Sequence, residues 1–167
     1  MSLTIVEKLT EGKVFVCTKP NSSINLPSSQ RVQQKNFAGV HPAGNAGTHI
    51  HFLDPVSDHK TVWTISYQEI IAIGKLFVTG ELPVERVLSI AGPVVKKPRL
   101  VKTRLGANVS ELLSNELTAK SYRGISGSVF GGRTAMNSVD YVGRYANQIS
   151  ALEESTEREF MGWLSPG

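Results

Sequence analysis

The sequence VKTRLGANVSELL at residues 101–113 combines a strand pattern with a helix pattern. The odd positions of 101–105 carry Val, Thr and Leu, and the even positions carry Lys102 and Arg104. This alternation predicts a strand with one apolar and one basic face. Asn108, followed three residues later by Glu111, is typical of a helix N-terminus. The apolar stripe of this short helix is formed by Val109, Leu112, Leu113 and Leu117.

The flanking sequence predicts further strands at 87–91, 125–129 and 141–152, the last being the longest. Gly92-Pro93 interrupts the chain between the first two strands of this region. The resulting order is strand, turn, strand, helix and then further strands. It indicates an α+β fold of the β-grasp kind, in which a small sheet half-wraps one helix.

The chain before residue 84 has a different pattern. The stretches 12–17 and 61–65 predict strands, and the polar stretch 20–34 predicts a loop. Between Ser66 and Gly80 the sequence predicts a well-defined helix, because Ser66 and Glu69 have the spacing of a capping box and Gly80 suits a left-handed C-terminal cap. Its apolar stripe comprises Tyr67, Ile70, Ile71, Gly74, Phe77 and Val78. Gly74 on that stripe predicts the close approach of another element.

Composition excludes several classes of protein. The 167 residues carry a formal charge of +4, which is mild for a dedicated nucleic-acid binder. No apolar run approaches the roughly 18 residues that a membrane span requires. Cys17 is the one cysteine, so an internal disulfide, a four-cysteine zinc site and a cysteine-held iron–sulfur cluster are excluded within this sequence. We expect Cys17, in an apolar strand, to be a buried and unreactive thiol.

The histidines near position 45 suggest two interpretations. On a strand, His49 and His51 would project from the same face and could share a metal ion, with His41 or Asp54 as a third ligand. Alternatively, the histidines form hydrogen bonds to the backbone in a glycine-rich turn. Without a clear third ligand we favour the second interpretation, and no metal site or catalytic residue is assigned.

A cluster of basic residues on and beside the strand that follows Pro98 is a second candidate site. Its members are Lys96, Lys97, Arg99, Lys102 and Arg104. The cluster could contact an acidic protein partner or anionic lipid headgroups. The alternative, which we favour, is an ordinary charged face of a sheet. No aromatic residues alternate with the charges, so a nucleic-acid partner is not expected.

Several blocks in one order carry a family resemblance: HPAG at 41–44, GTH at 47–49, HFL at 51–53, AIGKLF at 72–77, TGEL at 79–82, AGPVV at 91–95 and KPRLV at 97–101. ISGSV at 125–129, YVGR at 141–144 and GW at 162–163 continue the series. Together they resemble the A subunits (NqrA) of the bacterial sodium-translocating NADH:quinone reductase. The corresponding subunit of the Rnf complex carries cysteine-rich motifs, so the single cysteine favours the sodium pump.

The resemblance implies a peripheral subunit on the cytoplasmic side of the bacterial inner membrane. Electrons would pass from NADH to ubiquinone through flavins and iron–sulfur centres in the other subunits, which are the implied partners. Residues 1–3 would be a leader, 4–83 part of a Rossmann-like domain, and 84–154 a β-grasp domain of the soluble-ligand-binding (SLBB) type. Residues 155–167 would be a linker into a further region, in keeping with the apolar cluster at the end of the sequence.

For the segment itself we expect a cofactor-free scaffold and subunit-interaction module. One alternative is that it forms part of the quinone-binding pocket, which requires an apolar slot and hydrogen-bond donors. The candidate contacts to quinone or to a partner are His49, His51, Phe52, Trp63, Lys96, Lys97 and Arg99. The other alternative is a stand-alone ligand-binding β-grasp protein unrelated to respiration.

Overall fold

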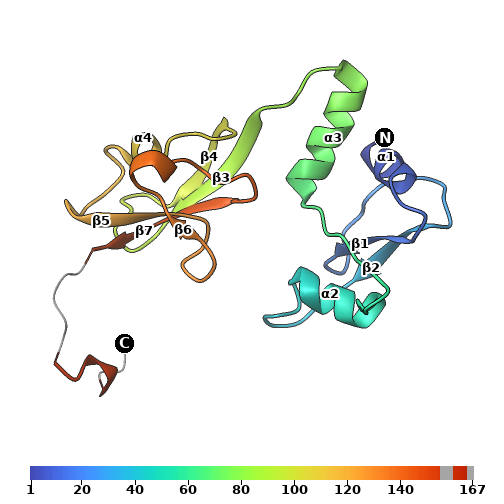
Figure 1. Ribbon diagram of the computed structural model, residues 1–167, viewed down its shortest axis with the longest axis horizontal. Coiled ribbons are helices and arrows are strands. Elements are labelled where there is room, and N and C mark those ends of the chain that lie inside the picture. The colour runs from blue at the N-terminus through green and yellow to red at the C-terminus, as the bar shows by residue number, and fades with distance from the viewer. Residues whose placement is uncertain (155–159, 165–167) are drawn as a thin grey trace. The chain divides into compact units, whose positions relative to one another are not determined.

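The structure, a computed structural model, describes residues 1–154 and 160–164 and divides into Met1–Pro83 (unit 1) and Val84–Gly167 (unit 2) (Figure 1). The linker expected at 155–167 lies for the most part outside the described residues. Helices and strands occur in both units, which confirms the α+β fold class.

Unit 2 contains a five-stranded sheet in the order β4-β3-β7-β5-β6. Its strands are β3 (Glu85–Ala91), β4 (Arg99–Arg104), β5 (Tyr122–Ser126), β6 (Arg133–Thr134) and β7 (Gln148–Glu153). The hairpins β3–β4 and β5–β6 are antiparallel, and β7 lies between them, parallel to β3 and antiparallel to β5. With helix α4 (Val109–Leu113) against β5, this is the expected β-grasp arrangement (Figure 1).

The core of unit 2 follows from alternation along its strands. Leu88 and Ile90 in β3 and Ile149 in β7 are almost fully buried, and Val109 and Leu113 of α4 pack into the same cluster. Asn108 caps α4 as expected, since its side-chain oxygen accepts a hydrogen bond from the Glu111 amide over 2.8 Å. The apolar face of the helix and that of the sheet therefore form one core.

Two expectations for unit 2 need adjustment. The strand expected at 125–129 is instead β5, which begins at Tyr122 and ends at Ser126. Only the second half of 141–152 is extended, as β7; the residues before it form turns, preceded by the 3-10 helix Asn137–Val139. A second 3-10 helix spans Gly162–Leu164.

Unit 1 contains the helices α1 (Ser2–Lys8), α2 (Ala46–Leu53) and α3 (Tyr67–Thr79) and the strands β1 (Val14–Thr18) and β2 (Val32–Asn36). The two strands form a parallel two-stranded sheet. The loop prediction for 20–34 was wrong at its end, because β2 begins at Val32. The strand prediction for 61–65 was wrong, because these residues have no regular structure.

Helix α3 has the predicted ends. The Ser66 side chain accepts a hydrogen bond from the Glu69 amide, and Gly80 has the left-handed conformation, with φ at 75°. Gly74 is buried against α1, where an added Cβ would overlap the Ser2 side chain and lie 3.3 Å from Ser2 Cα. The prediction of a close approach at Gly74 is thus confirmed.

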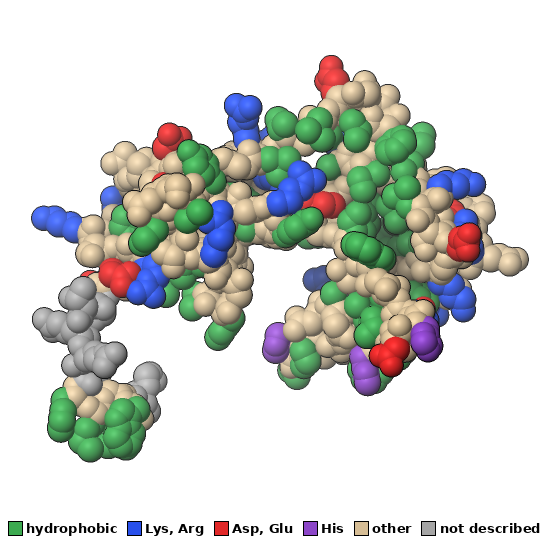
Figure 2. Space-filling model, in the orientation of Figure 1, with side chains coloured by type: hydrophobic (Ala, Val, Ile, Leu, Met, Phe, Trp, Pro, Cys, Tyr) green, Lys and Arg blue, Asp and Glu red, His purple; other side chains and the backbone are tan. Residues whose placement is uncertain are grey.

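The rest of the α3 stripe is not buried as its pattern predicts. Tyr67, Ile71, Phe77 and Val78 are each more than half exposed, and hydrophobic side chains are visible at the surface along α3 in Figure 2. Among the hydrophobic residues of unit 1, all of which the structure describes, Val32 alone is buried. The pattern identified the helix correctly but overestimated how much of its apolar surface is covered.

Candidate functional site

The histidine candidates lie on helix α2 rather than on a strand. Its first residue, Ala46, follows the N-cap Asn45, and the helix ends at Leu53. Residues two apart on a helix point away from each other, so His49 and His51 do not share a face. The geometry for a shared metal ion, which assumed a strand, was therefore wrong. Within residues 1–154 and 160–164, no three side chains of His, Cys, Asp or Glu are grouped so that they could hold a metal ion.

His49 is held against the turn that precedes α2. Its Nε2 donates a hydrogen bond to the carbonyl oxygen of Ala43 over 2.8 Å, and its ring lies 4.2 Å from the Phe37 ring, centroid to centroid. This backbone hydrogen bond is the one that our favoured interpretation expected. Because a carbonyl only accepts, Nε2 carries the proton that is donated to Ala43, and this N–H is not available to another acceptor.

His51, Phe52 and Trp63 are all exposed. The His51 and Phe52 rings meet edge to face at 5.1 Å, and Phe52 is 72% and Trp63 89% exposed. Figure 2 shows histidine side chains at the surface of unit 1, over the region of α2 in Figure 1. These side chains are available to a ligand or partner, but no enclosed apolar slot is formed by them among the described residues.

The basic candidates Lys96, Lys97 and Arg99 lie where the chain enters β4. Arg99 forms a bidentate pair with the Glu116 carboxylate, with Nη1 donating over 2.6 Å and Nη2 over 2.8 Å. Lys96 donates from Nζ to the Asn115 carbonyl over 3.0 Å, and its amide donates to the Glu116 carbonyl. Two of the three residues thus tie the start of β4 to the segment after α4, while Lys97 projects into solvent.

Hydrogen bonding sets the electrostatics of this pair. The hydrogen bond from the Arg99 guanidinium lowers the pKa of the Glu116 carboxyl, and attraction to Arg99 and Lys96 acts in the same direction against partial desolvation. The same hydrogen bond raises the pKa of Arg99. Both groups are therefore charged at neutral pH. The negative charge of Glu116 offsets the positive charge of Arg99 at this point of the surface.

The other members of the basic cluster lie on the exposed face of β4. Lys102 forms an ion pair with Glu85, which lies diagonally across from it on β3, and Arg104, directly opposite Glu85, is exposed. Sequence reasoning missed the carboxylates that neutralise this cluster, because Glu85 and Glu116 lie on other elements. The available signal was weak: Glu85 sits at the start of the neighbouring strand, where an antiparallel hairpin places it opposite the end of β4.

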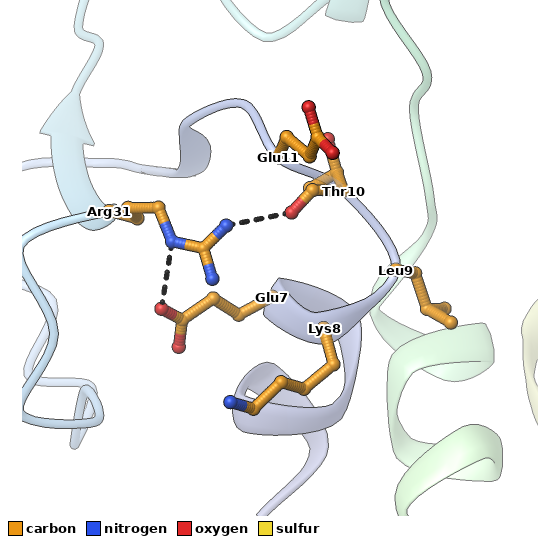
Figure 3. Close-up of a pocket in the computed structure, with 6 residues that line it drawn as sticks. All are labelled: Glu7, Lys8, Leu9, Thr10, Glu11 and Arg31. Atoms are coloured by element: carbon orange, nitrogen blue, oxygen red, sulfur yellow. Dashed lines mark hydrogen bonds and ion pairs between the residues drawn. The ribbon is translucent and has the colours of Figure 1, made fainter.

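A hollow of about 410 Å³ lies in unit 1 between α1 and the chain before β2 (Figure 3). It is lined by Glu7, Lys8, Leu9, Thr10, Glu11 and Arg31. Arg31 spans it, donating from Nη1 to the Thr10 carbonyl over 2.8 Å and lying 3.3 Å from the Glu7 carboxylate. None of the predicted site residues lines this hollow, and its charged lining does not suit an apolar ligand.

Cys17 is half-buried in β1, and desolvation raises the pKa of its thiol. A raised pKa leaves the thiol protonated and a weak nucleophile at neutral pH. The expectation of an unreactive thiol agrees with this direction, although the side chain is less buried than expected.

Comparisons with known proteins match most of the chain. Residues 1–82 match the model of the NqrA second alpha/beta domain, and residues 87–137 match that of the NQRA C-terminal domain. The A subunits of the Na(+)-translocating NADH-quinone reductases of Hahella chejuensis and Pasteurella multocida are 57% and 58% identical to this chain. Each match covers 99% of this chain and 37% of the relative. Among the described residues, no helix has the length and apolar character needed to cross a membrane.

Proposed function

Because the chain belongs to the NqrA family, the A subunits of Na(+)-translocating NADH-quinone reductases, we propose that it is a segment of a peripheral subunit of such an enzyme. The enzyme couples electron transfer from NADH to ubiquinone to sodium transport. The segment lies on the cytoplasmic side of the inner membrane. The observation that carries the proposal is 57–58% identity over 99% of the chain.

Within the subunit, the segment acts as a cofactor-free scaffold and subunit-interaction module. An iron–sulfur cluster needs several thiolates, and this sequence has only Cys17. We assign the flavins and iron–sulfur centres of the enzyme to other subunits. We assign residues 4–83 to a Rossmann-like domain and 84–154 to an SLBB-type β-grasp domain.

The charged side chains of unit 2 support the scaffold role, because several of them hold the fold together. Arg99 and Glu116 join the start of β4 to the segment after α4, and Arg123 in β5 binds Glu154, the residue that follows β7. Such bidentate pairs fix geometry between elements. Lys97, which projects from this braced surface, is the candidate contact to another subunit.

Lysine cross-linking in the assembled enzyme tests the interaction role. We expect Lys97 to cross-link to another subunit, whereas Lys120, an exposed lysine of the same unit, serves as the reference. Lys97→Glu should weaken retention of the subunit in the purified complex about tenfold, and Lys120→Glu should leave it unchanged. If the two lysines behave alike in both assays, Lys97 is an ordinary solvated residue and not a contact to another subunit.

Part of a quinone-binding site is a second candidate function for unit 1. The exposed rings of Phe52 and Trp63 and the exposed imidazole of His51 favour it, since they could supply apolar contact and a donor. His49 is the weaker donor, because its Nε2 proton is already bound to the Ala43 carbonyl. This candidate needs a second surface to enclose the quinone.

Two variants and one control separate the functions. If unit 1 contacts quinone, His51→Ala and Trp63→Ala lower quinone-dependent turnover at least tenfold while NADH oxidation by an artificial acceptor continues. His59→Ala, an exposed histidine outside α2, is the matched control. Unchanged quinone turnover in both variants removes the quinone role and leaves the scaffold role standing.

A further inference from the structure

Strand β1 of unit 1 uses only one of its two edges. The Val14 amide donates to the Arg31 carbonyl over 2.9 Å, and the Thr18 carbonyl accepts from the Phe37 amide over 2.8 Å. With the parallel register Val14↔Val32 to Thr18↔Asn36, every second residue of β1 therefore faces β2. The backbone groups of Phe15 and Cys17 point to the opposite edge. Within unit 1, which is described throughout, no strand pairs with that edge.

The side chains of β1 are those of an interior strand. Val14 and Val16 occupy one face and Phe15 and Cys17 the other, so both faces are apolar. Strands that are apolar on both faces are typical of the middle of a parallel sheet covered on each side. All five residues of β1 are nevertheless only half-buried.

Strand β2 has the opposite character. After Val32 its residues are Gln33, Gln34, Lys35 and Asn36, all polar. A polar, lysine-bearing strand is typical of a sheet edge, where charge discourages further pairing. The two strands therefore differ in kind: β2 resembles a natural edge of the sheet, and β1 resembles a strand with a missing neighbour.

The source of that neighbour follows from length and burial. The chain spans 37% of the length of the relatives it matches. In unit 1 Val32 is the one buried hydrophobic residue, whereas unit 2 has a cluster of fully buried side chains. Unit 1 thus leaves much apolar surface uncovered, and the family's full-length proteins have ample further sequence to cover it.

We propose that the open edge of β1 is completed by an added strand, an extended segment from the rest of the full-length NqrA-type subunit. It pairs with the backbone N–H and C=O groups of Phe15 and Cys17. Its own side chains are apolar and β-branched, matching the two apolar faces of β1. The inference concerns how the subunit folds and does not require that unit 1 bind quinone or another subunit.

Residue-resolved amide exchange tests the strand addition. In the 167-residue chain the amides of Phe15 and Cys17 should exchange about as fast as those of Gln34 and Asn36, which face the outer edge of β2. In the full-length subunit carrying this sequence, Phe15 and Cys17 should slow by about 100-fold, while Gln34 and Asn36 stay fast. Continued fast exchange at Phe15 and Cys17 in the full-length subunit would overturn the proposal.

Proline variants of the full-length subunit give a second test. Phe15→Pro removes an N–H that β2 does not use, so it blocks the added strand but spares the β1–β2 pairing. It should lower the yield of folded full-length protein at least tenfold relative to Phe15→Ala, which loses only the side chain. Asn36→Pro, on the outer edge of β2, is the matched control. It is compared with Asn36→Ala, which also loses the hydrogen bond from the Thr18 hydroxyl, and should give the same yield.

The oligomeric state of the 167-residue chain identifies the occupant. A monomer by sedimentation, together with the protection pattern above, supports a strand from the same subunit. A dimer in which Phe15 and Cys17 are protected in the short chain itself would assign the edge to a second copy and overturn the proposal. Yields of Phe15→Pro and Asn36→Pro that fall equally would also overturn it, because both edges would then matter alike.

Discussion

Replacing Gly92 with alanine tests the packing of the unit 2 sheet most directly. Gly92 follows β3 and has φ at 138°, a conformation that favours glycine. An added Cβ would overlap the carbonyl oxygen of Ala151 in β7 and lie 2.9 Å from its carbonyl carbon. Ala151 is fully buried and its backbone belongs to the central strand, so the neighbour cannot move away without disturbing the sheet.

The expected cost has two parts. Holding alanine at φ 138°, outside the left-handed helical region, costs about 1–3 kcal/mol, and forcing β7 away from β3 adds about 1–3 kcal/mol by overpacking. A total loss of about 3 kcal/mol would lower the melting temperature by roughly 12–24 °C, at about 4–8 °C per kcal/mol for a unit of this size.

Urea unfolding followed by circular dichroism, combined with amide exchange in β3 and β7, measures this loss of stability. The matched control is Gly106→Ala, at φ 67° with no heavy atom within 4 Å of the added Cβ. It keeps the positive-φ cost, about 1–2 kcal/mol, without the overlap. If Gly92→Ala were no more destabilising than Gly106→Ala, the close approach of β3 and β7 at this point would be refuted.

Three further predictions concern individual contacts. Gly74→Ala should loosen α1 and speed exchange of its amides at least tenfold, and Ser2→Gly in the same chain should restore protection; unaltered exchange in Gly74→Ala would refute the contact. Arg99→Ala should raise the pKa of Glu116 toward its ordinary value, as measured by carboxyl NMR. Because Arg99 depresses that pKa in the folded state, the pair's contribution is present above the ordinary value and is lost as the pH falls through the lowered one. Cys17 should react with iodoacetamide severalfold more slowly in the native chain than in urea at pH 8, since burial raises its pKa; equal rates would contradict this.

Features set by residues close in sequence could be predicted well. Ser66, Glu69 and Gly80 determine where α3 begins and ends through contacts within a few residues of each helix end, and the structure has these contacts. The same holds for Asn108 and Glu111 at the start of α4. Capping is local chemistry, so a short window of sequence contains all of its information.

Features that depend on distant partners were predicted less well. The stretch 61–65 has the β-branched and aromatic residues of a strand, but it finds no strand to pair with. Strand β2 has no apolar alternation after Val32, and its extended form comes from pairing with β1. β propensity describes how well a side chain fits a sheet, and pairing decides whether a sheet is there.

The candidate site shows the same division. Lys96, Lys97 and Arg99 are near one another because they are adjacent in the chain, and this was predictable. Their neutralising partner Glu116 lies beyond α4 and is brought back to β4 only by the fold. For His49 and His51, the surrounding glycines suggested a turn or strand, whereas Asn45 preceding Ala46 was the signal for a helix start that was not used.

The distribution of these errors has a physical cause. In unit 2 they are displaced strand ends, the largest at 141–147, where turns replace the first half of an expected strand. In unit 1 they change the type of element at 32–36 and 61–65 and the geometry of the histidines. Pattern reading assumes that apolar residues mark the core. That assumption holds for Leu88 and Ile149, which are fully buried, and fails for Phe52 and Trp63, which are exposed. Where a chain has no core to cover its apolar side chains, the spacing of these side chains no longer predicts which face of a helix or strand is buried. The weakness of the predictions for unit 1 and the open edge of β1 therefore have one origin, the shortage of buried apolar surface in that unit.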